Sequence, residues 1–154
     1  MRRSRSRPSR PELLANERPM MELTWLSRWQ PQLLAVLRIV VGLLFLEHAL
    51  SKFFGFPVPF PVHPLPPLLV AAGVIELVTG VLVTIGLFTR IAAFIASGEM
   101  AVAYWMEHFP KSPWPLANMG EGAILFCFVF LYIAAAGPGA WSIDGARTRS
   151  APIH

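Results

Sequence analysis

Four glutamates lie within long apolar stretches of this chain, and their position suggests proton chemistry. One falls in each of four apolar runs: Glu47, Glu76, Glu99 and Glu121. A carboxylate inside hydrocarbon is costly, so it is usually paired, protonated or kept for a task. One per run predicts a polar centre inside a small bundle of membrane helices. A carboxyl group held there can donate a hydrogen bond to a carbonyl or pass a proton.

Position along the runs divides the glutamates into two layers. Glu76 and Glu99 lie near the middle of their runs, beside small residues at steps of three and four. Small residues allow helices to approach closely in membranes, so both carboxyls are expected on packed faces. We interpret them as the proton-handling pair. Glu47 lies late in the first run and Glu121 early in the fourth, so these two are expected under the outer loops.

Arg38 in the first run is predicted to be the cation that tunes this inner pair, so Glu76, Glu99 and Arg38 form the candidate catalytic group. Arginine stays charged, and burying it requires an anion or many acceptors. The alternative is that it snorkels to the inner headgroups. Desolvation favours neutral carboxyls, and one arginine cannot balance four, so some glutamates are expected to be protonated at neutral pH. The alternative for each glutamate is an interhelical hydrogen bond that holds the bundle together.

A candidate substrate-binding group is predicted nearer the outer surface. Its members are Glu47, His48, Lys52, His108 and Glu121. Lys52 is expected to pair with Glu47 or Glu121, or to anchor at the headgroups. His48 follows Glu47, and His108 follows another glutamate, but metal ligands on one helix need spacings of three or four residues. No metal site is therefore predicted.

The elements that must position these residues are four apolar runs, each close to the roughly 20 residues that cross a hydrocarbon core as a helix. They span about 33–52, 66–88, 91–109 and 119–137. The chain has 154 residues, of which 55% are hydrophobic and 14% charged. This is too apolar for an ordinary soluble domain, and the runs carry no polar stripe at helical spacing. The predicted fold class is all-α, an integral membrane four-helix bundle.

Positive charge predicts the orientation of the bundle. With the N-terminus inside, most of the arginines fall on the inner side, including Arg28, Arg90, Arg147 and Arg149. The outer side receives only Lys52 and Lys111. This asymmetry favours two cytoplasmic termini. We expect a multi-pass protein of the bacterial cytoplasmic (inner) membrane, with the lipid bilayer as its first partner.

Three segments follow from composition. They are a disordered basic tail and interfacial segment at 1–30, the four-helix domain at 31–145, and a short basic tail at 146–154. Arginine, serine and proline dominate residues 1–19, where nothing could bury a core. The sequence leaves open whether Met1, Met20 or Met21 is the true first residue. No secretory signal is recognisable, and a solvated tail is favoured over a nucleic-acid-binding arm.

Both outer loops are rich in proline. Residues 55–67 hold six prolines among thirteen residues, and the loop near 110–118 holds three more. Such a density excludes helix and ladder strand, so a stiff, extended cap is expected. A lid over a site is the functional interpretation, and a rigid connector is the alternative.

Several motifs with known chemistry do not occur in the sequence. It contains no Walker loop, no GxGxxG after a strand, no GxSxG elbow and no haem-attachment CxxCH. The single cysteine, Cys127, excludes an intrachain disulfide and a CxxC pair. No redox cofactor is evident, so a redox function would draw its electrons from a partner.

Four stretches carry a family resemblance. They are LRIVVGLLFLEHALSKFFG, IELVTGVLVTIGLFTRIAA, EHFPKSPWPLANMGEGAILFCFVFLY and the ending GPGAWSIDGA, which is the most specific. Over about 33–145 the chain resembles the DoxX family of small membrane proteins. Ala49 departs from the glycine expected in many members. The resemblance implies a four-helix membrane protein.

The resemblance also carries a functional expectation. Some members are linked to oxidoreductase complexes, including the small subunit of a thiosulfate:quinone oxidoreductase, others occur with redox-defence proteins, and many have no assigned activity. The positions that match the family pattern are Arg38, Lys52, Glu76, Arg90, His108, Asn118, Glu121 and Asp144. Asn118 thereby joins the candidate substrate-binding group. Asp144, with Ser142, is expected to cap the chain end at the inner interface.

Three functions compete. The first is a membrane oxidoreductase subunit that binds a quinone or similar apolar redox molecule, whose reduction consumes protons, and that works with a redox protein partner. The second is a non-enzymatic subunit that anchors or stabilises a complex. The third is a small proton-coupled carrier, for which a homo-oligomer would double the number of helices. We favour the first. The sequence specifies neither the substrate nor the electron donor, nor the oligomeric state.

Overall fold

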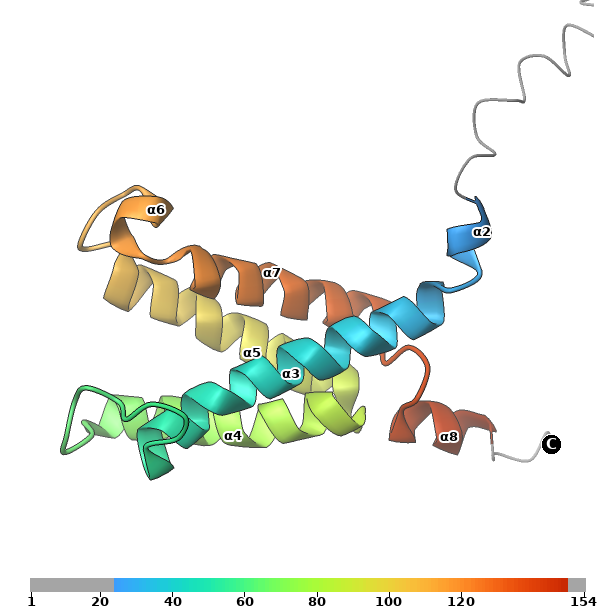
Figure 1. Ribbon diagram of the computed structural model, residues 1–154, viewed down its shortest axis with the longest axis horizontal. Helices are drawn as coiled ribbons and strands as arrows, with labels where there is room; N and C mark the ends of the chain where they lie inside the picture. The colour runs from blue at the N-terminus through green and yellow to red at the C-terminus, as the bar shows by residue number, and fades with distance from the viewer. Residues whose placement is uncertain (1–23, 150–154) are drawn as a thin grey trace, which may run out of the picture. The chain divides into compact units, whose positions relative to one another are not determined.

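The computed structural model describes residues 24–149 (Figure 1). The predicted tail at 1–19, the choice among Met1, Met20 and Met21, and residues 150–154 of the C-terminal tail lie outside the described residues. Within residues 24–149 all regular structure is helical, without a strand. The prediction of an all-α fold is confirmed for this part of the chain.

The helices follow the predicted apolar runs closely. In chain order they are α2 (Thr24–Ser27), α3 (Gln30–Phe54), α4 (Pro67–Ile85), α5 (Thr89–Ala103), the π-helical segment η2 (Tyr104–His108), α6 (Pro115–Asn118), α7 (Glu121–Ala136) and α8 (Ile143–Arg149). The chain divides into two units, residues 1–30 and 31–154. In the first, the Arg28 guanidinium lies over the ring of Trp29, 5.7 Å from its centroid.

One stripe of α3 faces the other helices. Its members recur at steps of three and four: Arg38, Val41, Phe45, Ala49 and Lys52 are all buried. This is the spacing that keeps side chains on one face of an α-helix. The stripe therefore has a charged residue at each end and apolar residues between them.

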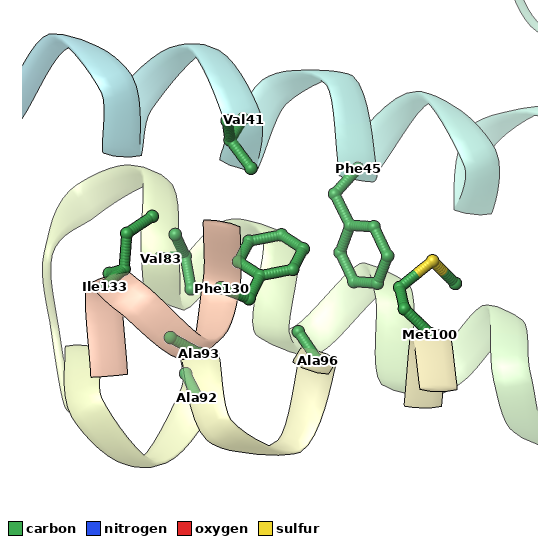
Figure 2. Close-up of a cluster of buried hydrophobic side chains, with 9 residues drawn as sticks. All are labelled: Val41, Phe45, Val83, Ala92, Ala93, Ala96, Met100, Phe130 and Ile133. Carbon is green, nitrogen blue, oxygen red and sulfur yellow. The ribbon is translucent and has the colours of Figure 1, made fainter. Parts of the chain in front are cut away.

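The apolar middle of the molecule is shared by four helices. Figure 2 shows the buried cluster, which consists of Val41, Phe45, Val83, Ala92, Ala93, Ala96, Met100, Phe130 and Ile133. The rings of Phe45 and Phe130 meet edge-on, with centroids 4.8 Å apart, a favoured aromatic geometry. The small α5 residues let α7 approach closely. The helices thus pack as membrane helices do, through small residues and rings.

The outward faces of the same helices are also apolar. Large hydrophobic side chains are exposed all along them, including Leu43 at 47%, Val78 at 51%, and Phe94 and Phe128 at 65%. A soluble monomer rarely exposes apolar surface so extensively, whereas lipid covers it at no cost. Among the described residues, α3 and α4 are long and apolar enough to cross a membrane, and α7 is a shorter apolar helix. The number of spans stays a prediction.

Two local features shape the ends of α4 and α5. Gly86 adopts φ 71° after α4, and Leu87 N–H donates to the carbonyl of Leu82 at 2.9 Å, as in a Schellman motif. At the other end, Phe109 N–H donates to the carbonyl of Tyr104 at 2.9 Å. This widened π turn continues α5, and such turns are frequent at functional sites. Figure 1 shows α6 and the loop after α3 at the end opposite α8.

Candidate functional site

Arg38 binds backbone carbonyls near α8. It is 0% exposed. Its Nη1 donates to the carbonyls of Val83 and Thr84, both at 2.6 Å, while its Nε and Nη2 donate to those of Pro138 and Trp141, both at 2.9 Å. Carbonyls at the C-terminus of α4 have no partner within the helix and carry the negative end of its dipole. The guanidinium fork therefore joins three segments of the chain.

This geometry overturns the predicted role of Arg38. Its hydrogen-bond partners are carbonyls, not the carboxyls of Glu76 and Glu99, so the predicted pairing is wrong. Snorkelling is also wrong, since the side chain is buried. Arginine burial needs an anion or many acceptors, and here the acceptors suffice. We no longer place Arg38 in the catalytic group.

Arg90 and Asp144 tie neighbouring helix ends together. Arg90 Nη1 donates to the carbonyl of Ala134 at 2.8 Å, at the C-terminus of α7. The Asp144 carboxylate accepts bonds from Phe88 N–H at 3.0 Å and from Thr89 N–H at 2.9 Å and Oγ1 at 2.8 Å. A carboxylate there satisfies free N–H groups and complements the dipole of α5. We call Arg38, Arg90 and Asp144 with their partners the lock.

Asp144 therefore has a capping role, but it caps α5 rather than the end of the chain. Partial burial by itself would raise the pKa of this carboxyl. The hydrogen bonds from Thr89 and Phe88 outweigh that effect and hold the pKa below its usual value. The carboxylate is the form that accepts these bonds, so the cap depends on ionised Asp144.

At the opposite end of the helices lies a cavity of about 420 Å³. Its polar lining comes from α3, α4, α5, η2 and the loop after η2. These residues are His48, Lys52, Glu76, Glu99, Glu107, His108 and Lys111. The structure thus brings the inner pair together with three members of the predicted outer group. Apart from these polar residues, the lining of the cavity is mostly apolar.

An ion pair lies at the base of the cavity. Lys52 Nζ is 2.5 Å from Glu76 Oε1, and the two residues are 7% and 2% exposed. The prediction that Lys52 pairs with Glu47 or Glu121 is therefore wrong. Lys52 Nζ also lies 5.6 Å from the ring centroid of Phe60, within range of a cation–π contact.

Two carboxyl oxygens beside this pair are unsatisfied. Glu76 Oε2 and Glu99 Oε2 are buried and have no hydrogen-bond partner among the described residues. Buried polar atoms nearly always have a partner, so each exception asks for an explanation. Both residues line the cavity. Their free oxygens suit a ligand donor, or a proton that the carboxyl then gives to a ligand acceptor.

His108 is held in place by the loop before α7. Its Nδ1 lies 3.0 Å from the carbonyl of Asn118, and because a carbonyl only accepts, Nδ1 carries the proton. Asn118 Nδ2 donates to the carbonyl of Ser112 at 2.8 Å, and Gly120 N–H donates to Asn118 Oδ1 at 2.7 Å. The side chain of Asn118 is occupied by the loop, so this residue supports His108 and does not line the cavity.

Besides Arg38 and Asn118, two more predicted residues lie outside the cavity, and several residues of its lining were not predicted. Glu47 and Glu121 are exposed and are not part of its lining. Glu107, Lys111 and Phe60 do line it but were not predicted. Glu107 reaches it from the π turn, for which the sequence gives no signal. In contrast, the prolines of residues 55–67 did predict an extended loop beside the site.

The proline-rich loop forms part of the cavity wall through Phe60 and Val62. Ser51 holds it against the end of α3: its Oγ donates to the carbonyl of Val58 at 2.7 Å, and its carbonyl accepts from Phe60 N–H at 3.3 Å. The loop therefore lines the site and is also tied to α3, which fits both the lid and the rigid-connector interpretations.

Comparison with known proteins gives a family and little about activity. A family model described as DoxX matches residues 33–109. An uncharacterized protein of Haemophilus influenzae is 43% identical over 127 residues, which cover 77% of this chain and 93% of that protein. An uncharacterized membrane protein of Mycobacterium tuberculosis is 27% identical over 161 aligned positions, covering 94% and 91% of the two chains. No solved structure matches the chain.

Proposed function

The chain belongs to the DoxX family, and on that premise we propose that it is a quinone-binding subunit of a membrane-associated oxidoreductase system. The ligand is a quinone or a similar apolar redox molecule, and it occupies the cavity at Lys52, Glu76 and Glu99. The electrons come from a redox protein partner in the same membrane.

The proposed topology has four membrane spans, formed by α3, α4, α5 with η2, and α7, in the bacterial inner membrane. Arg90 and Arg147 belong to the lock end, whereas Lys52 and Lys111 line the cavity. The positive-inside rule then puts the lock, and both termini, on the cytoplasmic side. The cavity faces the outer leaflet, beneath the proline-rich loop.

The observation that carries the proposal is the pair of unpartnered carboxyl oxygens beside a buried cation. Reduction of a quinone to a quinol takes up two electrons and two protons, one proton at each carbonyl oxygen. The Lys52 ammonium, which ionised Glu76 holds in place, can donate a hydrogen bond to one such oxygen. Protonated Glu99 can give one proton to the quinone, and the second proton follows when Glu99 is protonated again. Preorganised donors stabilise the negative charge that develops on the reduced ring.

Protons can reach the cavity from the outer surface. His48 is exposed and lines the cavity, as does Glu107. His108, fixed through Nδ1, presents its second ring nitrogen as an acceptor. These residues therefore offer donors and acceptors for a relay that returns a proton to Glu99.

Binding of a decyl-benzoquinone by the protein purified in mild detergent tests the proposal. Glu76→Gln and Glu99→Gln keep the shape of each side chain but remove its acid, and each is expected to weaken binding by about tenfold, the effect of one lost charge-assisted hydrogen bond. The matched control Glu121→Gln changes an exposed glutamate outside the cavity and is expected to bind like the wild type.

Unchanged quinone binding and membrane redox activity in Glu76→Gln and Glu99→Gln, with normal accumulation of both variants, would refute the proposal. Loss of a partner complex after deletion of the protein, without any effect of these substitutions, would instead indicate an anchoring or stabilising subunit. Proton-coupled uptake by purified protein in liposomes would indicate a carrier.

A further inference from the structure

An apolar groove lies between α4 and α5 next to the cavity. It has a volume of about 250 Å³. Its walls include Leu68 and Ile75 of α4 and Ile95 and Val102 of α5, and its only charged members are Glu99 and Glu107. Leu68, Ile95 and Val102 are exposed at 53%, 46% and 54%. The groove therefore opens on the apolar surface that lipid would cover.

The groove and the cavity share a wall. Five residues line both: Leu69, Ala72, Glu99, Ala103 and Glu107. Two of them are alanines, which leave the wall thin. Glu99 is half-buried, and its Oε2 is one of the two unpartnered carboxyl oxygens. The apolar groove and the cavity with its charged groups thus adjoin at the carboxyl group of Glu99, which has an unpartnered oxygen.

Each space is left open by a helical glycine. A Cβ at Gly98, which lines the groove, would meet no other atom within 4 Å, and the same is true of Gly122, which lines the cavity. Other helical glycines differ, since a Cβ at Gly42 would collide with the Oγ1 of Thr84. The packing of the helices explains Gly42. It explains neither Gly98 nor Gly122, both of which enlarge a space.

We propose that the groove holds the hydrocarbon chain of the ligand whose ring occupies the cavity, so that the ligand is a two-part lipid such as an isoprenoid quinone. This inference rests on the proposed function. The charged groups of the cavity suit a ring with carbonyl acceptors, whereas an apolar chain beside them would leave them unsolvated. The groove offers the chain apolar walls. Such a ligand reaches its site sideways from the bilayer, between α4 and α5, because Phe60 and Val62 close part of the outer side.

Two probes separate the ring from the chain: a decyl-benzoquinone and a benzoquinone without a side chain. Gly98→Leu fills the groove, so it is expected to weaken binding of the decyl compound by about tenfold, in line with the cost of overfilling a packed site. Binding of the chainless compound is expected to stay unchanged. Gly122→Leu fills the cavity and is expected to weaken both.

Two control variants keep the test interpretable. Gly98→Ala adds a single methyl where nothing lies within 4 Å and shows that the position tolerates a side chain. Val78→Phe adds bulk to an exposed position of α4 outside the groove and is expected to leave both affinities unchanged. Thermal unfolding of each variant in detergent confirms that it is folded.

The possible failures are distinct. If neither quinone binds to the wild-type protein, the proposed function itself falls. If both bind but Gly98→Leu changes neither affinity, or changes both alike, the ring site stands and the groove proposal is refuted. Altered retention of copurified phospholipid in Gly98→Leu, with unchanged binding of the decyl compound, would also refute it, because a structural lipid would then occupy the groove.

Discussion

The buried stripe of α3 has a cation at each end, Arg38 and Lys52, and the two cations are bound in opposite ways. Arg38 donates to backbone carbonyls of two segments, the end of α4 and residues 138–141. Arg90 and Asp144 bind further free groups of helix ends nearby. Lys52 has one carboxylate partner, Glu76. At that end two carboxyl oxygens have no partner among the described residues. Around Arg38 the polar groups are hydrogen-bonded within the protein. Around Lys52 the two carboxyl oxygens gain a partner only from a ligand or a proton.

The difference teaches how a polar group in a membrane helix can be assigned a role. A buried charge with all its bonds made to the backbone stabilises one structure and has nothing left to offer a ligand. A buried ion pair adds little net stability compared with apolar side chains, because desolvation offsets the attraction. A buried ion pair that lies beside unpartnered carboxyl oxygens therefore favours a functional role over a stabilising one. Gln32 Oε1 on α3 is another buried side-chain oxygen without a partner among the described residues.

Arg38→Met should break the lock and have the largest effect. It removes the Arg38 donors from the carbonyls of Thr84, Pro138 and Trp141, and each carbonyl left without a donor costs about 1–3 kcal/mol. We expect the free energy of unfolding, measured by detergent denaturation, to fall by about 4 kcal/mol. Arg28→Gln, at an exposed arginine, is the control. A fall below about 1 kcal/mol would mean that the lock does not stabilise the fold.

Lys52→Met tests the difference between the two buried cations, because a second substitution at Glu76 can reverse its effect on stability. Removing one partner of a buried ion pair costs about 3 kcal/mol, whereas replacing both by apolar residues is often neutral. We expect Lys52→Met to lower the free energy of unfolding by that amount and Lys52→Met/Glu76→Leu to recover most of it. Quinone binding should be lost in both. No rescue in the double variant would contradict a functional origin of the pair. Arg28→Met, at an exposed cation outside the cavity, serves as the control.

Asp144→Ala should have the smallest effect, about 1 kcal/mol, as expected for a lost helix cap. The pKa of Asp144 is lowered in the folded protein, so its contribution is present above the pKa of the unfolded chain and is lost as pH falls through the folded value. The difference in unfolding free energy between wild type and Asp144→Ala should therefore shrink on acidification. A difference that grew instead would contradict the cap. Thr89→Val, which removes one of the three bonds to Asp144, should lose less.

Much of the architecture could be predicted because it depends on local chemistry. The first run, predicted at 33–52, is α3, and the third, predicted at 91–109, covers α5 and η2. The proline-rich loop also lies between helices as predicted. The spacing of Phe45, Ala49 and Lys52 already places Lys52 on the buried stripe. That signal could have favoured a buried partner for Lys52 over an exposed one.

By itself, the sequence determined an apolar all-α chain with a carboxyl group in each long helix, because hydropathy and helical period act within a single segment. Only the tertiary structure decided which cation meets which acceptor. Pairing across helices depends on their relative depth, on the bend at the Gly86 turn and on the π turn after α5, none of which a single segment specifies. Because of those features, Arg38 binds backbone carbonyls and Lys52 binds Glu76. The carboxyl group of Glu99 lies between the cavity and the apolar groove.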